Sequence, residues 1–153
     1  MTGAEAFEDK LEELLQLPYW VIDILPEQVP PDSPGQFFAV ERYYLQSPRV
    51  EELRRKFADI LLKLNCYYDF EVFAGPGGAP LHDPDPEKLV RSVIIAGPEE
   101  DPVSIMILSE NVLITIGKDD TYMTAYGLTS GMRDLIGKLA GAEGLFLWQP
   151  PQD

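Results

Sequence analysis

The 153-residue chain has little of what most catalytic and metal sites are made from, since it contains one cysteine, Cys66, and one histidine, His82. A single thiol cannot form an internal disulfide, which fits a reducing compartment. Zinc is usually held by several cysteine and histidine side chains, so this composition predicts no metal site and no cofactor. It also disfavours the common nucleophile–base pairs of hydrolases.

The predicted surroundings of these two residues argue against catalysis as well. Cys66 ends a predicted helix, where the negative end of the helix dipole disfavours a thiolate, so we expect a small buried thiol. His82 lies in an acidic loop, a poor place for a positioned base. The acids of 83–87 have the spacing of a calcium loop, but Lys88 stands where that loop needs glycine. The glycines of 75–78 lack the Lys-Ser/Thr of a phosphate-binding loop.

Basic residues are also scarce, with 12 Lys and Arg against 26 Asp and Glu, for a net charge of −14. Nucleic acid and anionic membranes are therefore not expected as partners, because both are bound through clustered basic side chains. The excess of acids serves solubility or presents a surface to a basic protein. For a partner surface, the candidate residues are the acids of the first predicted helix, Glu8, Glu12 and Glu13.

Long hydrophobic runs are absent too, and every apolar stretch is shorter than the roughly 20 residues of a membrane helix. The first nine residues have neither the basic start nor the apolar run of an export signal. We therefore expect a cytoplasmic protein. The length and the 45% hydrophobic content predict a single globular domain over 1–153.

Apolar residues at helical spacing predict three helices, at about 4–17, 48–65 and 129–141. The second is the clearest, because Ser47 and Pro48 form a typical helix start. Its apolar face includes Phe57 and Leu61, which we expect to be buried against a sheet.

Strand-like runs account for most of the remaining chain. The fold class predicted is α+β, with a largely antiparallel sheet, or two packed sheets, of about seven or eight strands in the order α-β-β-α-β-β-β-β-β-α-β. A Gly-, Pro- and acid-rich segment at 74–88 is predicted to be a flexible loop. The hairpin–helix–strand order in 19–73 and 112–148 suggests a duplication as a hypothesis. The predicted strands are 19–25, 36–46, 67–73, 89–96, 103–108, 112–116, 122–126 and 145–148.

Alternation along three predicted strands places acids and tyrosines on shared faces. If these strands are neighbours, Asp23, Glu41, Asp69 and Glu71 converge beside Tyr43. Packed carboxylates raise each other's pKa and can cleave sugars, whereas an acidic and aromatic face suits a cationic ligand. The alternative is the ordinary solvent-facing side of an antiparallel sheet.

No motif determines a function. The composition favours a non-catalytic, regulatory or immunity-like protein that binds a basic protein partner. The alternatives are a small-molecule-binding domain or hydrolase that uses the carboxylate–tyrosine face, and a self-associating structural domain.

Overall fold

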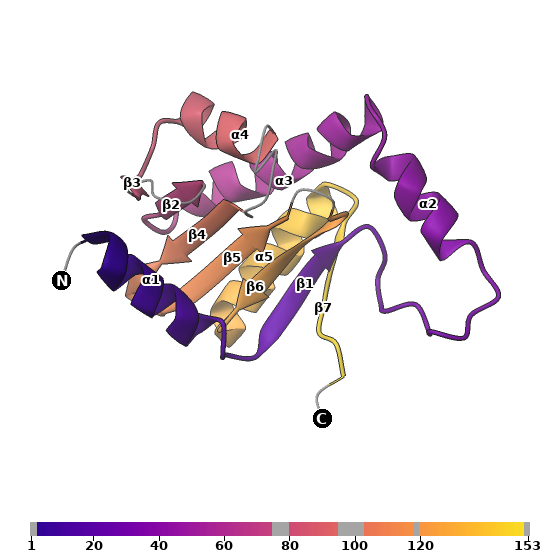
Figure 1. The fold of residues 1–153 in the computed structure, drawn as a ribbon, viewed down its shortest axis with the longest axis horizontal. Coiled ribbons are helices and arrows are strands. Elements are labelled where there is room, and N and C mark those ends of the chain that lie inside the picture. The colour runs from indigo at the N-terminus through magenta and orange to yellow at the C-terminus, as the bar shows by residue number, and fades with distance from the viewer. Residues whose placement is uncertain (1–2, 75–79, 95–102, 118–119, 152–153) are drawn as a thin grey trace.

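The computed structural model in Figure 1 describes residues 3–74, 80–94, 103–117 and 120–151. Within these ranges the strands form one seven-stranded sheet in the order β3-β2-β4-β5-β6-β1-β7. Every neighbouring pair is antiparallel, which confirms the predicted α+β class. The strands are β1 (Tyr19–Asp23), β2 (Glu71–Ala74), β3 (Leu81–His82), β4 (Val103–Ile107), β5 (Val112–Ile116), β6 (Tyr122–Tyr126) and β7 (Phe146–Trp148).

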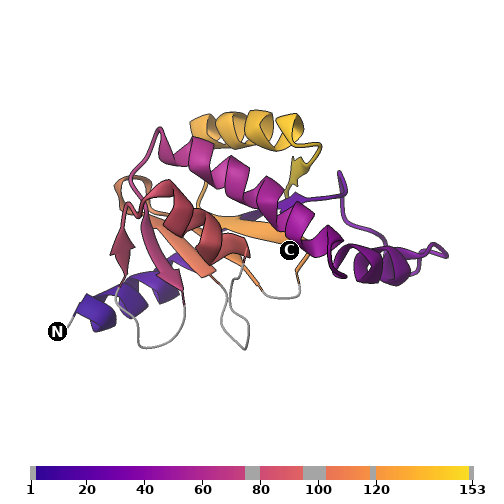
Figure 2. The same cartoon turned by 90° about the horizontal axis from the view of Figure 1, so that it is seen from above.

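Five α-helices accompany the sheet in the described ranges, with a short 3-10 turn at Leu108–Glu110. Three of them cover one face, and α1 lies on the other (Figure 2). The helices are α1 (Gly3–Leu14), α2 (Phe37–Tyr44), α3 (Arg49–Asn65), α4 (Pro86–Ile94) and α5 (Ser130–Ala142).

The main core lies between the sheet and the three helices α3, α4 and α5. Alternate residues of β1, β2, β4, β5 and β6 point into it, as period-two side-chain geometry requires; in β5 these are Val112, Ile114 and Ile116. Phe57 and Leu61 of α3 are fully buried there, as predicted. The Thr129 side chain caps α5 by accepting a hydrogen bond from the Met132 N–H, which also agrees with the sequence.

On the opposite face α1 covers only part of the sheet. Phe7 and Leu14 pack on Met106 of β4 and Leu113 of β5 in a second, smaller core. Over β6, β1 and β7 this face carries no helix from the described residues. The chain from 24 to 36 leads from β1 to α2, which extends from the end of α3 away from the sheet (Figure 1).

Two predicted strands are helices instead. Residues 36–46 contain a single β-branched residue, and the half-buried positions Phe37, Glu41 and Leu45 follow a spacing of four, which is the helix repeat. The run from Leu89 belongs to α4, whose start combines a capping Asp85 with Pro86 at the first helical position.

These corrections change the organisation of the first half. With α2 in place of a strand, 19–73 has no hairpin–helix–strand unit, so the duplication hypothesis is wrong. The predicted loop 74–88 is shorter than expected, because β3 pairs with β2 and α4 begins at Pro86. Residues 75–79 of that loop lie outside the described residues.

Candidate functional site

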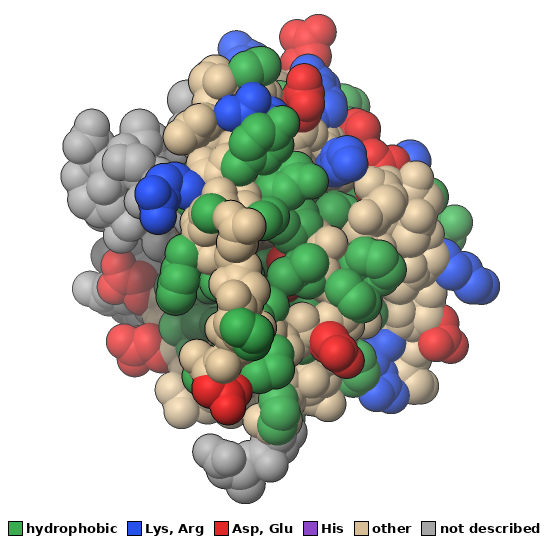
Figure 3. All heavy atoms as spheres, turned by 90° about the vertical axis from the view of Figure 1, so that its right-hand side faces the viewer, with side chains coloured by type: hydrophobic (Ala, Val, Ile, Leu, Met, Phe, Trp, Pro, Cys, Tyr) green, Lys and Arg blue, Asp and Glu red, His purple; other side chains and the backbone are tan. Residues whose placement is uncertain are grey.

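A pocket of about 600 Å³ opens on the sheet face that α1 leaves uncovered. Its floor comes from β1, β6 and β7, and its wall comes from the chain between Leu25 and Phe38. Figure 3 shows this side of the molecule, where hydrophobic side chains gather centrally and charged ones lie around them. Its aromatic lining consists of Tyr19, Phe37, Phe38, Tyr122, Tyr126 and Trp148.

Strand register explains why the floor is aromatic. Antiparallel pairing places Tyr19 opposite Tyr126 and Asp23 opposite Tyr122, so these side chains share one face. The rings of Tyr19 and Tyr126 lie 5.6 Å apart between centroids. Trp148 of β7 pairs with Val21 and closes the far side of the floor. Residues from both ends of the chain therefore build one surface.

The carboxylate of Asp23 is the polar centre of this pocket. Only 9% of the residue is exposed. Its Oδ1 accepts a hydrogen bond from the Ile24 N–H at 2.7 Å, and its Oδ2 accepts one from Trp148 Nε1 at 3.3 Å. Burial raises the pKa of Asp23 above its ordinary value, and the nearby Glu41 carboxylate raises that pKa further, against these hydrogen bonds. Among the described residues no Lys or Arg forms an ion pair with Asp23.

The two tyrosines of β6 stay neutral at physiological pH. Burial raises the pKa of both Tyr122 and Tyr126, and the carboxylates of Asp120, Glu41 and Asp23 add to the rise at Tyr122. The pocket therefore combines neutral aromatic faces with a buried carboxylate. Such a combination attracts organic cations, through the negative faces of the rings and through the carboxylate.

Helix α2 forms an outer wall of the pocket. The structure describes all eight of its residues, and none of them is buried. Phe38 is 73% exposed beside the pocket. Arg49 of α3 holds the C-terminal end of α2, because its guanidinium lies 3.8 Å from the Tyr43 ring centroid and its Nε donates to the Tyr43 carbonyl. The predicted ligand residue Tyr43 therefore contacts Arg49, remains exposed, and does not line the pocket.

The four carboxylates expected to converge are split between two places. Asp23 and Glu41 lie close enough to interact electrostatically, although only Asp23 lines the pocket. Glu71 lies in β2, four strands from β1, which corresponds to roughly 19 Å across the sheet. The expected convergence is wrong because it required 36–46 to be a strand beside both others.

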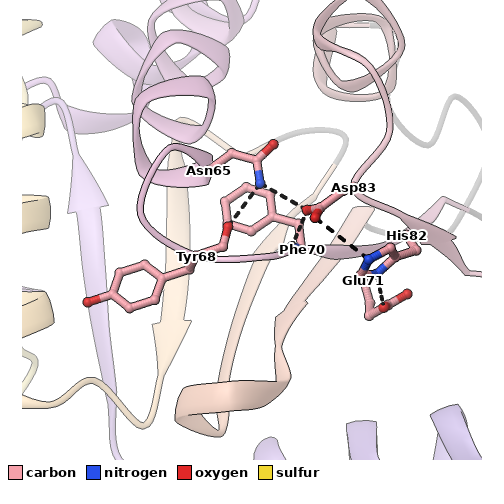
Figure 4. A network of polar contacts seen from close by, with 6 residues as sticks. All are labelled: Asn65, Tyr68, Phe70, Glu71, His82 and Asp83. Carbon is pink, nitrogen blue, oxygen red and sulfur yellow. Dashed lines mark hydrogen bonds and ion pairs between the residues drawn. The ribbon is translucent and has the colours of Figure 1, made fainter.

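At that far end the polar side chains form a network of their own (Figure 4). His82 Nδ1 lies 2.6 Å from Glu71 Oε1, and His82 Nε2 lies 3.7 Å from Asp83 Oδ2. The hydrogen bond with Glu71 raises the pKa of His82. The Phe70 N–H lowers the pKa of Asp83, whereas the hydrogen bond with Asp83 raises the pKa of Asp69. His82 is thus a positioned side chain and not the loosely held loop residue that its sequence context predicted.

Two further sequence-based candidates lie elsewhere. Cys66 is exposed, so the expectation of a buried thiol is wrong. It follows the last buried position of α3, Leu64, and faces away from the core. Glu8, Glu12 and Glu13 are exposed on the outer side of α1. Their role as partner-binding residues stays a prediction.

No protein-family model matches the chain, and neither a search of curated proteins nor a search of solved structures found a match. None of the described helices is both long and apolar enough to cross a membrane.

Sequence reasoning identified Asp23 but missed the rest of the pocket. Tyr122, Tyr126 and Trp148 were placed correctly on strands, and the alternation of aromatics in 122–126 was a usable signal. Their meeting with Asp23 depends on the insertion of β1 between β6 and β7, which joins segments about a hundred positions apart. No local pattern encodes that order.

Proposed function

We propose that this chain is a non-catalytic binding protein whose pocket receives a basic side chain, Arg or Lys, from a partner protein. The observation that supports this most strongly is Asp23, a nearly buried carboxylate in an aromatic pocket with no basic partner among the described residues. Removing a charge from water costs free energy unless an opposite charge compensates it. A cation in the pocket supplies that compensation.

The remaining hydrogen-bonding capacity of Asp23 fits this role. The Asp23 carboxylate accepts hydrogen bonds from the Ile24 and Leu25 N–H groups and from Trp148 Nε1, whereas its two oxygens together offer about four lone-pair positions. A guanidinium or ammonium group donates to the free positions, while its stem lies against Tyr122 and Trp148. Arg and Lys carry long apolar stems below a charged head, so they match a pocket whose floor combines aromatic rings with a carboxylate.

The surroundings favour a side chain from a protein over a free small molecule. Among the lining residues, Phe38 and the prolines at 30 and 31 are exposed and continue the apolar surface toward solvent. On the same sheet face, α1 exposes Glu8, Glu12 and Glu13, and the chain carries a net charge of −14. Charge of this kind accelerates association with a basic protein.

The lining also supports binding over catalysis. Among the lining residues that the structure describes there is no histidine, cysteine or lysine to serve as base or nucleophile. Asp23 is held by the Ile24 and Leu25 N–H groups and by Trp148 Nε1, as suits a fixed binding group.

The test uses a panel of short peptides that each carry one Arg between aromatic or apolar neighbours. Matched control peptides with citrulline in place of Arg keep the shape of that side chain and remove its charge. We expect only the Arg peptides to bind, measured by calorimetry, and Asp23→Asn to weaken binding at least tenfold, since charged hydrogen bonds are worth about 1.5–3 kcal/mol.

The matched control is Asp134→Asn, which removes the same charge from an exposed position of α5 on the other face of the sheet. It should leave affinity unchanged. Equal binding of Arg and citrulline peptides, or an unaffected Asp23→Asn variant, would disprove the proposal. If free arginine binds as tightly as the peptides, the pocket serves a small-molecule cation instead.

A further inference from the structure

Three metal-ligating side chains meet at the end of the sheet far from the pocket. Asp69, His82 and Asp83 each offer one ligand atom, and these atoms all lie within 4.8 Å of one another. We propose that these three residues bind one divalent transition-metal ion, such as Zn²⁺, and that Glu71 is the positioning residue of the site. This site is independent of the pocket and of the function proposed for it.

The imidazole distinguishes this cluster from an ordinary acidic patch. Glu71 Oε1 lies 2.6 Å from His82 Nδ1, so the carboxylate fixes the ring and takes the Nδ1 proton as its hydrogen-bond donor. The lone pair of the neutral ring is then on Nε2, which faces Asp83 Oδ2 at 3.7 Å. Metal-bound histidines are typically held in this way, with the other ring nitrogen donating to a carboxylate.

Hydrogen bonds also fix the orientation of the Asp83 side chain (Figure 4). Its Oδ1 accepts hydrogen bonds from the Phe70 N–H at 2.7 Å and from Asn65 Nδ2 at 3.1 Å. These two donors occupy one oxygen and leave Oδ2 directed toward His82. The Asp83 N–H in turn donates to the Phe70 carbonyl at 2.8 Å, which fixes the backbone at this position. The side chains of His82 and Asp83 are therefore both oriented before an ion binds.

Strand pairing positions the imidazole of the site. Glu71 of β2 lies opposite His82 of β3, so the positioning carboxylate and the imidazole are held by the ladder. Asp69 stands two residues before Glu71 and approaches the same point. Of the three ligands only His82 lies in a strand, whereas Asp69 precedes β2 and Asp83 follows β3 directly.

The donor set selects the kind of ion. Calcium and magnesium prefer oxygen ligands alone, whereas Zn²⁺ and its neighbours bind imidazole together with carboxylates. One nitrogen and two carboxylates leave coordination positions for water. All three ligands are exposed, so an ion reaches them without any movement of the core.

The experiment uses the full chain without an affinity tag and zinc chloride as the probe. His82 is the one histidine of the chain, so its imidazole resonances in NMR need no assignment. We expect stoichiometric Zn²⁺ to shift them and calorimetry to show one ion per chain. Glu71→Gln should weaken binding by about 10–100-fold, the usual effect of losing the group that orients a metal-bound histidine.

The variants Asp69→Asn and His82→Ala should abolish stoichiometric binding, and thermal melts check that both remain folded. The matched control is Glu87→Gln, which removes an exposed acid a few residues away. It should bind Zn²⁺ like the parent chain. Unmoved His82 resonances at saturating Zn²⁺, or equal affinity in the His82→Ala and parent chains, would overturn the proposal.

Discussion

Two consecutive helices, α2 and α3, differ in how much of their surface is buried. Helix α3 lies on the sheet and buries seven of its residues, whereas none of the eight described residues of α2 is buried. Both have apolar side chains at helical spacing. The difference lies in what each helix faces, because α3 packs on strand residues and α2 extends beyond the sheet (Figure 1). Apolar pattern alone therefore does not tell a core helix from a surface helix.

The two faces of the sheet differ in a similar way. Below α3 the core is apolar, whereas on the side of α2 a pocket holds a buried carboxylate. Side chains of the first face should govern stability. The side chains that line the pocket on the second face should govern binding, with little or adverse influence on stability.

The largest effect is expected on the α3 side. Phe57→Ala should lower the free energy of unfolding by roughly 3–5 kcal/mol, because truncating a fully buried aromatic side chain removes its contacts and leaves a cavity. Urea denaturation followed by circular dichroism measures this loss. A loss below about 1 kcal/mol would show that α3 does not anchor the core.

The pocket side should show the opposite behaviour through pH. The folded-state pKa of Asp23 is raised above its ordinary 3.8, so the folded chain binds this proton more tightly than the unfolded chain. The stability that this provides is fully present below pH 3.8 and is lost as pH rises through the raised pKa. Asp23→Asn should remove this component.

The measurement is the difference in unfolding free energy between the parent chain and Asp23→Asn, taken at several pH values. Other titrating groups cancel in that difference. It should shift in favour of the variant as pH rises from 3.8 upward, since only the parent chain then buries a charge. A difference independent of pH would show that Asp23 titrates normally.

The same contrast explains which elements were predictable from sequence. Helix α3, the meander of β4, β5 and β6, and helix α5 were predicted nearly to the residue, because local periodicity and turn residues define them. Helix α2 was missed because paired Phe and Tyr residues favour strands. Helix α4 was missed although Asp85 and Pro86 signal its start.

Neither site was predictable in full, because each depends on strand pairing. The pocket joins distant segments, whereas Glu71 and His82 are only eleven positions apart but were assigned to a strand and a loop. Tyr19 meets Tyr126, and Glu71 meets His82, only through strand order and register. The absence of a metal site was predicted from the low number of histidines and cysteines. A ligand set of one imidazole with carboxylates needs only a single histidine, so a low number of histidines and cysteines does not exclude it.

The smallest stability effect, and the sharpest test of the contrast, belongs to Phe38 on α2. Phe38→Ser should change the free energy of unfolding by less than about 0.5 kcal/mol, because the side chain is 73% exposed and leaves no cavity. It should nevertheless weaken binding of the Arg peptides, since Phe38 lines the mouth of the pocket.

The matched control is Tyr67→Ser, an aromatic side chain that is 65% exposed near the end of α3. Both variants should be as stable as the parent chain, and only Phe38→Ser should lose affinity. If Phe38→Ser destabilised the chain by several kcal/mol, α2 would be part of the core and the contrast with α3 would fail. If both variants bound equally well, the partner would contact the pocket floor without touching α2.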